Sequence, residues 1–428
     1  MIEVGFTIAV MLVLLLLRIP VFLSIGLAAG AFALAFAPML RGDVLAQTFL
    51  RGLDNQAFSA IAYFFAAGAI MNAGGMSARL LELARALVAH IRGGLAHANI
   101  TASVVFAGIS GSAVADAAAV GSVMIPAMRR DGYPPAYAAA VTASSATIGL
   151  MIPPSIPMVV FALFTPADVT DLFLAGVLPG LLMGVFLLIA SVLLAVRRGY
   201  AAHEWQGFAR IGRALRSSFW ALMMPVLVIG GLLTGVATVN EIGALAAVYA
   251  VLVSVLIYRD VPLSDMIGSL ATAARDAAKI LIIVAASGAF VWISARVGLS
   301  LELAQFVSGL SLGPTALLAI IAVLLLVLGM VLEPVTLLVV IAPVIAPVAI
   351  LAGIDVVQLG VVFILASAIG LVTPPVGVLL FVTSAQAGVP LTQVVRESLV
   401  FLLALILLLC AVVAWPALTL GLGALLGQ

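Results

Sequence analysis

The sequence predicts an all-α, polytopic membrane protein made of two inverted-topology repeats, each with a re-entrant helical hairpin and a broken transmembrane helix. Three observations carry this prediction: a scarcity of charge, an abundance of helix breakers, and an internal repeat. Of 428 residues, 65% are hydrophobic and only 8% are charged, against about a quarter charged in soluble domains. Residues 132–167 and 356–395 contain no Asp, Glu, Lys or Arg. Such runs are long enough for transmembrane helices.

The same composition excludes several function classes. A net charge of +1 without a long basic cluster leaves no footprint for nucleic acid. The single cysteine, Cys410, provides neither a disulfide framework nor a cysteine metal site. The histidines lie near charged connecting segments, so we expect no haem and no histidine metal centre in the membrane: His90, His97 and His203. No P-loop occurs, so ATP hydrolysis by that route is not expected.

Glycine and proline mark a repeat at a fixed offset of 221 residues. The matching positions are Gly108 with Gly329, Pro126 with Pro347, Gly132 with Gly353, Ile148-Gly149-Leu150 with Ile369-Gly370-Leu371, and Pro153-Pro154 with Pro374-Pro375. The glycines and prolines break or bend helices, so their agreement in register indicates two copies of one fold. Breakers at membrane depth are typical of transporters that bind ions or substrates at helix ends.

Each copy is predicted to contain the same elements in the same order. Three spans come first, then an amphipathic segment, a hairpin of two short helices, a helix broken at a double proline, and a last span. The expected spans are 4–17, 20–38, 56–73 and 172–196 in the first copy, and 219–237, 241–258, 279–295 and 398–425 in the second. The amphipathic segments are 76–92 and 299–310, and the hairpins are Ala98–Arg129 and Pro314–Leu351. The segment 4–17 lacks a basic leader and is expected to be a retained span.

These elements divide the chain into two alternating sets of parts. One set holds the unbroken spans and the amphipathic segments, at 1–97, 172–218, 219–313 and 398–428. The other set holds the hairpins and the broken helices, at 98–171 and 314–397. If neither hairpin crosses the membrane, each copy has five crossings and the second copy is inverted. Placing the arginine-rich loop 197–216 in the cytoplasm then puts 15 of the 18 basic residues inside and both termini outside.

The first hairpin tip combines small residues, two hydroxyls and an acid, in the order Gly108-Ile109-Ser110-Gly111-Ser112-Ala113-Val114-Ala115-Asp116. Freed carbonyls, hydroxyl oxygens and a carboxylate are hard ligands that suit sodium. An ionisable group at membrane depth is a functional hypothesis by default. Alternatively, Ser110 and Ser112 cap the second helix and Asp116 lies in its first turn. Both descriptions can hold, because a cap and an ion site use the same atoms.

The second tip, Gly329 to Pro334, carries Glu333 where the offset places Ser112 in the first copy. Pro334 suits the first position of a new helix, with Glu333 near the positive end of that helix. A capping glutamate and a direct ligand are equally compatible with this pattern.

The broken helices lead into the double prolines, where unsatisfied carbonyls are expected. The predicted sodium ligands at tips and breaks together are Ser110, Ser112, Asp116, Ser145, Gly149, Gly329, Glu333, Gly370 and Thr373. A substrate carboxylate suits the helix N-termini beside the breaks. The predicted substrate-binding residues are Ser112, Pro154, Ser155, Pro375 and Val376. Sodium is the only metal expected, and no organic cofactor is expected.

Gly108-Ile109-Ser110-Gly111 also matches the Gly-x-Ser-Gly pattern of intramembrane serine proteases. That chemistry needs a histidine base in the membrane, and no histidine lies in a predicted span. With no other catalytic constellation present, an enzyme or an assembly scaffold is disfavoured. An ion channel would share the repeat and the hairpins, but it would not accumulate solute.

These motifs resemble the large membrane subunit of tripartite ATP-independent periplasmic (TRAP) transporters. The resemblance rests on the first tip, the Ile-Pro-Ala-Met run from 125, Ile-Pro-Pro-Ser-Ile-Pro at 152–157 and Thr-Pro-Pro-Val-Gly at 373–377, and it covers essentially the whole chain. One departure is Leu-Glu-Pro at the second tip, where the family is expected to have an aspartate before the proline.

The resemblance implies sodium-coupled secondary import of a carboxylate-bearing solute, such as a dicarboxylate, a sialic acid or another sugar acid. It implies an elevator mechanism, in which the hairpins and broken helices of 98–171 and 314–397 form a transport part that moves as one body. The scaffold would then be 1–97, 172–218, 219–313 and 398–428, with the amphipathic segments as arms. The implied partners are a small four-helix membrane subunit and a soluble periplasmic solute-binding protein, within the lipid of the bacterial inner membrane. A stand-alone sodium/anion symporter of the same architecture is the alternative.

Overall fold

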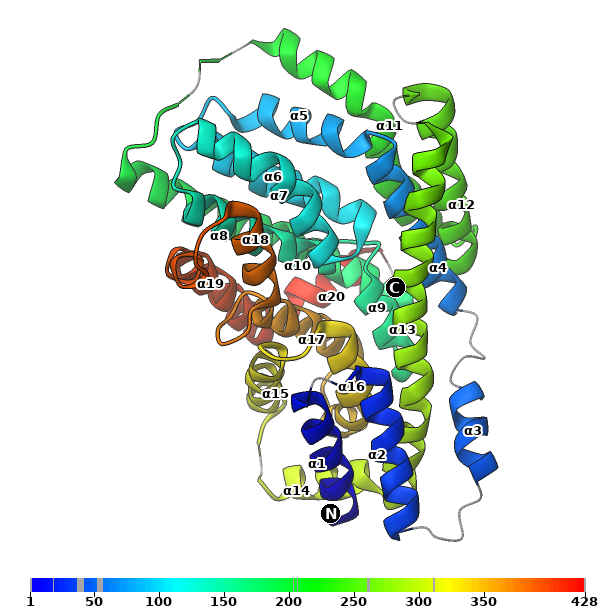
Figure 1. Ribbon diagram of the computed structural model, residues 1–428. Coiled ribbons are helices and arrows are strands. Elements are labelled where there is room, and N and C mark those ends of the chain that lie inside the picture. Colours follow the sequence, from blue (N-terminus) through cyan, green and yellow to red (C-terminus); the bar gives the residue numbers. More distant parts are fainter. Residues whose placement is uncertain are drawn as a thin grey trace.

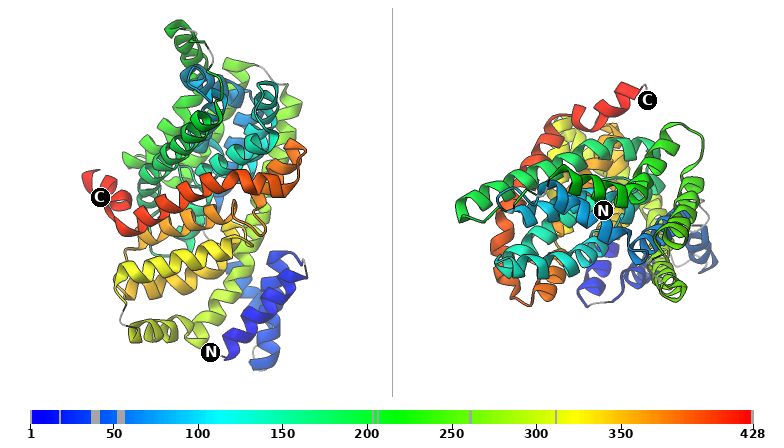
Figure 2. Two further views of the ribbon diagram at one scale, coloured as in Figure 1. Left: turned by 90° about the vertical axis from the view of Figure 1, so that its left-hand side faces the viewer. Right: turned by 90° about the horizontal axis from the view of Figure 1, so that it is seen from above.

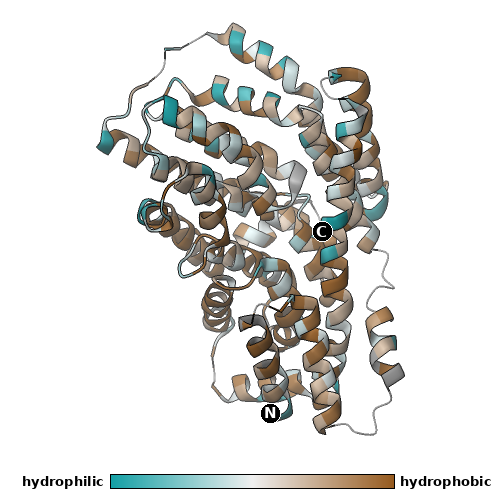
Figure 3. Ribbon diagram, viewed as in Figure 1, coloured by the Kyte–Doolittle hydropathy of each residue, from teal (hydrophilic) through white to brown (hydrophobic). Residues whose placement is uncertain are grey.

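The computed structural model describes residues 2–17, 19–36, 42–51, 57–202, 204–205, 207–259, 262–310 and 312–426. These ranges are helical almost throughout and contain no strand (Figure 1). Six of the described helices are long and apolar enough to cross a membrane, or seven if the bent pair α4 (Ala57–Ala73) and α5 (Met76–Val88) forms one span. Apolar residues dominate the ribbon in Figure 3. The chain is therefore an all-helical, multi-pass membrane protein.

The first half begins with three helices that precede the α4–α5 pair. α1 (Ile2–Leu16) and α2 (Val21–Phe36) correspond to the first two predicted spans, of which residues 37 and 38 lie outside the described ranges. α3 (Gly42–Arg51) was not predicted. The later elements are α6 (Gly94–Ser110), α7 (Ala113–Arg130), α8 (Pro135–Ala146), the 3-10 turn η1 (Thr147–Leu150), α9 (Ile156–Phe164) and α10 (Val169–Arg198).

The second half runs from α11 to α20. Its helices are α11 (Phe208–Leu233), α12 (Val239–Leu252) with the π-helical η2 (Val253–Tyr258), α13 (Leu263–Val297), α14 (Leu299–Gly309), α15 (Pro314–Gly329), α16 (Pro334–Leu351), α17 (Val356–Gly370), α18 (Val378–Ala387), α19 (Leu391–Ala414) and α20 (Ala417–Leu426). Adding the repeat offset to the bounds of α7 gives the bounds of α16. The start of α8 maps in the same way onto the start of α17.

Three predicted spans differ from the helices observed. α11 begins at Phe208 rather than at 219, inside the segment predicted as a loop. α13 begins at Leu263 rather than at 279, because the alanine-rich stretch before 279 favours a helix despite its charges. The predicted span 398–425 is divided, since α19 ends at Ala414 and α20 starts after Pro416. Proline lacks the N–H that would continue the ladder and favours an extended residue before it, as observed for Trp415, with φ −122° and ψ 92°.

Packing places the hairpins against the broken helices and surrounds both with the longer helices. α7 packs on α8 in the first half, as α15 packs on α17 in the second. α18 packs on both α7 and α8, and Gln386 donates a 3.0 Å hydrogen bond from Nε2 to the Ala118 carbonyl. The long α13 runs along most of the molecule in Figure 1 and packs against α2, α4 and α16. It therefore forms a wall beside the second hairpin.

The amphipathic helix α5 packs against the start of the second half. Glu82 forms an ion pair with Arg210 of α11, with 2.6 Å between Oε1 and Nη2. The guanidinium carbon of Arg79 lies 3.8 Å from the ring centroid of Tyr258. α5 and the start of α11 lie at the end of the molecule opposite the N-terminal helices α1 and α2 (Figure 2). Hydrophilic residues gather toward this α5–α11 end in Figure 3.

Candidate functional site

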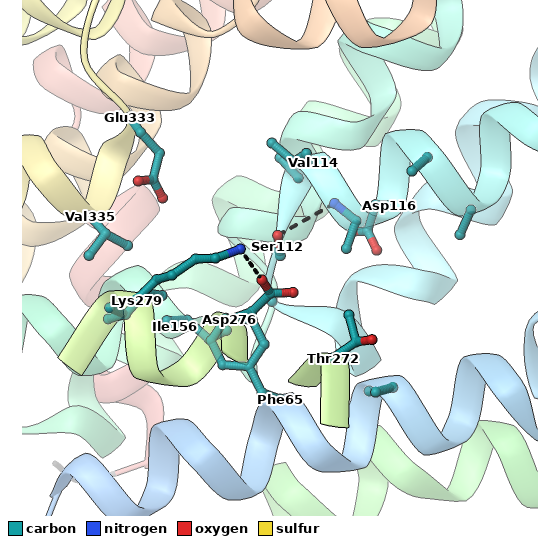
Figure 4. Close-up of a pocket in the computed structure, with 18 of the residues that line it drawn as sticks. Phe65, Ser112, Val114, Asp116, Ile156, Thr272, Asp276, Lys279, Glu333 and Val335 are labelled. Atoms are coloured by element: carbon teal, nitrogen blue, oxygen red, sulfur yellow. Dashed lines mark hydrogen bonds and ion pairs between the residues drawn. The ribbon is translucent and has the colours of Figure 1, made fainter. Parts of the chain in front are cut away.

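A cavity of about 940 Å³ lies between the hairpin tips and the helices α4 and α13 (Figure 4). The first turns of α7, α9 and α16 contribute Ala113, Ile156 and Pro334 to its lining. Three predicted site residues also line it: Ser112, Asp116 and Glu333. The structure thus brings both hairpin tips to one space.

The first tip turns at Gly111, whose φ of 61° lies in the left-handed region that favours glycine. Ser112 then begins α7 as its N-cap, with Oγ accepting a 3.5 Å hydrogen bond from the Ala115 N–H. The capping role considered for Ser112 is therefore realised, and the residue also lines the cavity. α6 ends at Ser110, whose side chain lies outside the described residues.

Asp116 is buried in the first turn of α7, with 1% of its surface exposed. Its carboxylate lies against the backbone of Gly149 in η1, where a Cβ on Gly149 would overlap Oδ2. Two residues that the sequence singled out are thus in direct contact. Gly149 is needed here because any larger residue would displace the carboxylate.

The first double proline closes on the hairpin tip. A Cβ on Gly111 would stand 2.8 Å from the Pro154 carbonyl oxygen, so the tip and the break touch through their backbones. Ser155 caps α9: its Oγ accepts from the Met158 N–H at 3.4 Å and donates to the Leu150 carbonyl at 2.5 Å. Pro154 and Ser155 are not among the described lining residues of the cavity, although the neighbouring first residue of α9 is.

The second tip is built differently. Glu333 occupies the N-cap position of α16 but makes no side-chain cap hydrogen bond in the described structure, and it is exposed beside the cavity. The capping alternative for Glu333 is therefore not realised. Behind the tip, Gly329 and Gly370 bring α15 and α17 into backbone contact, where a Cβ on Gly370 would overlap Gly329.

The other residues predicted near the second break are not among the described residues that line the cavity. Thr373 donates a 2.7 Å hydrogen bond from Oγ1 to the Ile369 carbonyl, which satisfies one carbonyl oxygen beside the break. Pro375 and Val376 are not among the described lining residues. Both double prolines, at 153–154 and 374–375, contain a cis peptide bond.

Ser145 lies in a buried polar network between α6 and α8. Its Oγ accepts a 2.9 Å hydrogen bond from Ser103, and Asn99 donates from Nδ2 to the Thr142 hydroxyl at 2.7 Å. All four side chains are at most 1% exposed. The network therefore joins the first hairpin to the broken helix, and among the described residues Ser145 is not brought to the cavity with the tips.

A polar stripe on α13 faces the cavity and was not predicted from the sequence. Its members lie three or four residues apart: Asp265, Ser269, Thr272, Asp276 and Lys279. This spacing places them on one face of a helix. The spacing is a local signal that could have revealed the stripe. Charged residues just before 280 are also expected at the end of a transmembrane span, however, so the signal does not by itself indicate a cavity.

Acids outnumber bases around the cavity. Among the described lining residues, Asp116, Asp265, Asp276 and Glu333 are acidic and Lys279 is the one base. Nζ of Lys279 lies 2.7 Å from Oδ1 of Asp276. Groups of three or more His, Cys, Asp or Glu side chains able to hold a metal together do not occur in the described ranges. A cation bound here would thus rely on single carboxylates with hydroxyl and carbonyl oxygens.

Comparisons with known proteins confirm the resemblance noted from the motifs. The family model of the tripartite ATP-independent periplasmic transporter, DctM component, matches residues 8–418. The C4-dicarboxylate TRAP transporter large permease protein of Pseudomonas aeruginosa is 36% identical over 405 residues, covering 95% of each chain. The sialic acid TRAP transporter large permease protein of Vibrio cholerae is 36% identical over 375 residues, covering 88% of each.

A solved structure shares the fold at low sequence identity. The crystal structure of the Alcanivorax borkumensis YdaH transporter matches with a TM-score of 0.64 at 15% identity, over 89% of this chain and 90% of that one. The matched relatives are transporter permeases, so this protein is a membrane transport component and not an enzyme. The chain belongs to the DctM family, the large permease subunits of tripartite ATP-independent periplasmic transporters.

Proposed function

We propose that this protein imports a carboxylate-bearing solute, driven by a sodium gradient, at the cavity between the hairpin tips and α13. The observation that carries the proposal is the buried Asp116 carboxylate held against Gly149, close to where the first tip meets the first break. A volume of about 940 Å³ is in the range of small-molecule sites. A buried acid beside such a space is a candidate for cation coupling.

The charge balance of the cavity supports a coupling cation. Four carboxylates against one ammonium, among the described lining residues, would repel an anionic solute unless cations enter with it. Oxygens from Asp116, from the Ser112 hydroxyl and from carbonyls freed at the helix ends are the hard ligands that sodium takes. The other predicted ligands stay predictions: Ser110, Ser145, Gly149, Gly329, Glu333, Gly370 and Thr373.

The solute class is inferred from the helix ends and from the relatives. The N-termini of α7, α9 and α16 all open on the cavity, and such termini favour carboxylates through their free N–H groups and dipoles. The relatives carry names that refer to C4-dicarboxylate, sialic acid and 2,3-diketo-L-gulonate, which are all anions. The predicted substrate contacts stay predictions: Ser112, Pro154, Ser155, Pro375 and Val376.

We infer an elevator movement in which α6–α9 and α15–α18 travel together as two inverted repeats. The Gln386 to Ala118 hydrogen bond and the packing of α18 on α7 and α8 support a single moving body. α5 and α14 would be the arms. The partners would be a small four-helix membrane subunit and a periplasmic solute-binding protein, in the bacterial inner membrane with both termini of this chain periplasmic.

Uptake into proteoliposomes that contain the protein with both partners tests the proposal. Solute should accumulate against its gradient only when sodium is higher outside. Equal uptake without a sodium gradient would contradict coupling, and downhill conduction without saturation would indicate a pore. Full accumulation without the binding protein and the small subunit would favour the stand-alone symporter.

A further inference from the structure

The cavity is lined by a basic side chain on the wall opposite the hairpin tips. Lys279 lies near the middle of α13, a 35-residue helix that includes one of the membrane-length apolar segments. Its side chain is 73% exposed, and in Figure 4 it reaches from α13 toward Ser112. A lysine within a span is costly unless it faces water or an opposite charge. Lys279 meets both conditions, because the cavity beside it can hold water and Asp276 supplies the opposite charge.

The partner of Lys279 holds it only loosely. Asp276 lies one turn earlier on the same helix, and its side chain is itself 43% exposed. Exposed pairs at this spacing contribute little to stability, because water competes for both ions. The ammonium can therefore exchange Asp276 for another carboxylate without a large loss.

An anion in this cavity has few charged partners to choose from. Among the described lining residues the acids repel it, and the attractive groups are the helix N-termini on one wall and Lys279 on the other. A solute that bridges the cavity would meet a helix dipole at Ser112 or Pro334 and an ammonium across from it. Charge-assisted hydrogen bonds of this kind are the stronger class.

We propose that Lys279 is a solute-binding residue, which leaves Asp276 and binds a carboxylate of the solute from the α13 wall. This inference rests on the proposed import of a carboxylate-bearing solute. It assigns recognition to a residue of the scaffold, whereas the contacts predicted at the tips and breaks lie in the moving part. Asp276 holds the ammonium in place while the cavity is empty of solute.

A purely structural role is the competing explanation. If Lys279 only neutralises Asp276, removing both charges together should restore function. If Lys279 binds solute, the double variant K279Q/D276N should remain as defective in solute affinity as K279Q. The double variant therefore separates the two roles even if one single variant misfolds.

The first experiment measures solute exchange in proteoliposomes of the complex with its partners, from the side that carries no binding protein. The probe is whichever of succinate, sialic acid and 2,3-diketo-L-gulonate the wild-type complex accumulates. We expect K279Q to raise the half-saturating concentration about 10- to 100-fold, as for the loss of a charge-assisted hydrogen bond. R275Q is the matched control and should stay near wild type, because Arg275 is an exposed cation on the same helix that is not among the described lining residues.

The second experiment restores the charge chemically. K279C is prepared in a C410S background, since Cys410 is the one native cysteine and lies on α19. Attaching an aminoethyl group to the introduced thiol by a mixed disulfide should recover solute affinity, because it returns an ammonium to the cavity. Attaching a sulfonatoethyl group, which adds a negative charge, should not recover it.

Each outcome decides the matter. An unchanged half-saturating concentration in K279Q, recovery in the double variant, an equal defect in R275Q, or equal rescue by both reagents would overturn the assignment while leaving import itself intact. A wild-type complex that accumulates its probe equally without a sodium gradient would overturn the proposed function, whatever K279Q does.

Discussion

Replacing Gly149 by alanine tests whether the contact with Asp116 positions a sodium ligand. The added Cβ would overlap Oδ2 of Asp116, and the oxygen would have to withdraw by about 1.3 Å or more to reach ordinary van der Waals separation. Overpacking of this kind costs about 1–3 kcal/mol. If the displaced carboxylate is a ligand, the same energy appears as a loss of sodium affinity of about 5- to 150-fold.

The assay is the sodium dependence of uptake in proteoliposomes with both partners, and the measured quantity is the half-saturating sodium concentration. We expect G149A to raise it by that factor while the purified protein still elutes as a single folded species. G230A is the matched control, since a Cβ on Gly230 of α11 meets no atom within 4 Å. A folded G149A variant with the wild-type sodium dependence would refute the reasoning.

Three further substitutions probe the elements around the site, and each is measured as the thermal unfolding midpoint in detergent. G370A should destabilise more than G149A, because the new Cβ overlaps the backbone of Gly329, which cannot turn aside as a side chain can; an equal or smaller loss would contradict the close approach. D355A should cost about 1 kcal/mol, since the Asp355 carboxylate caps α17 by accepting two backbone N–H bonds of 2.8 and 3.1 Å. An unchanged midpoint would show that the cap is dispensable. Q386A should cost about 0.5–1.5 kcal/mol through the lost bond to Ala118, and a larger loss would mean that Gln386 does more than join α18 to α7.

The second hairpin was predictable from sequence to the residue. Its expected bounds, Pro314 and Leu351, are the start of α15 and the end of α16. Proline at the first helical position and glycine at a tip act through local geometry, which does not depend on what packs nearby. Asp116 and Gly149 were each singled out as well. Their contact was not, because it depends on how α7 folds back over η1.

Features that arise only from packing were outside the reach of the sequence patterns. Lys279 lies at the start of a predicted span, and no binding role was predicted for it. A local concentration of charge in the sequence does not reveal that a cavity lies beside it. Sequence reasoning places Ser145 toward the tips, but the direction of its hydroxyl depends on how α8 is rotated against α6. The polar stripe of α13 did have a local signature in its spacing.

The buried network of Asn99, Ser103, Thr142 and Ser145 has a consequence for how this protein leaves the membrane under mechanical force. Apolar helices separate in a bilayer with little hydrophobic penalty, since lipid tails are as apolar as leucine. Hydroxyl and amide groups find no water in the hydrocarbon core to replace their partners. When the chain is pulled from one end, α6, α7 and α8 should therefore be extracted together, and residues 94–146 should give one rupture rather than three in a force–extension curve.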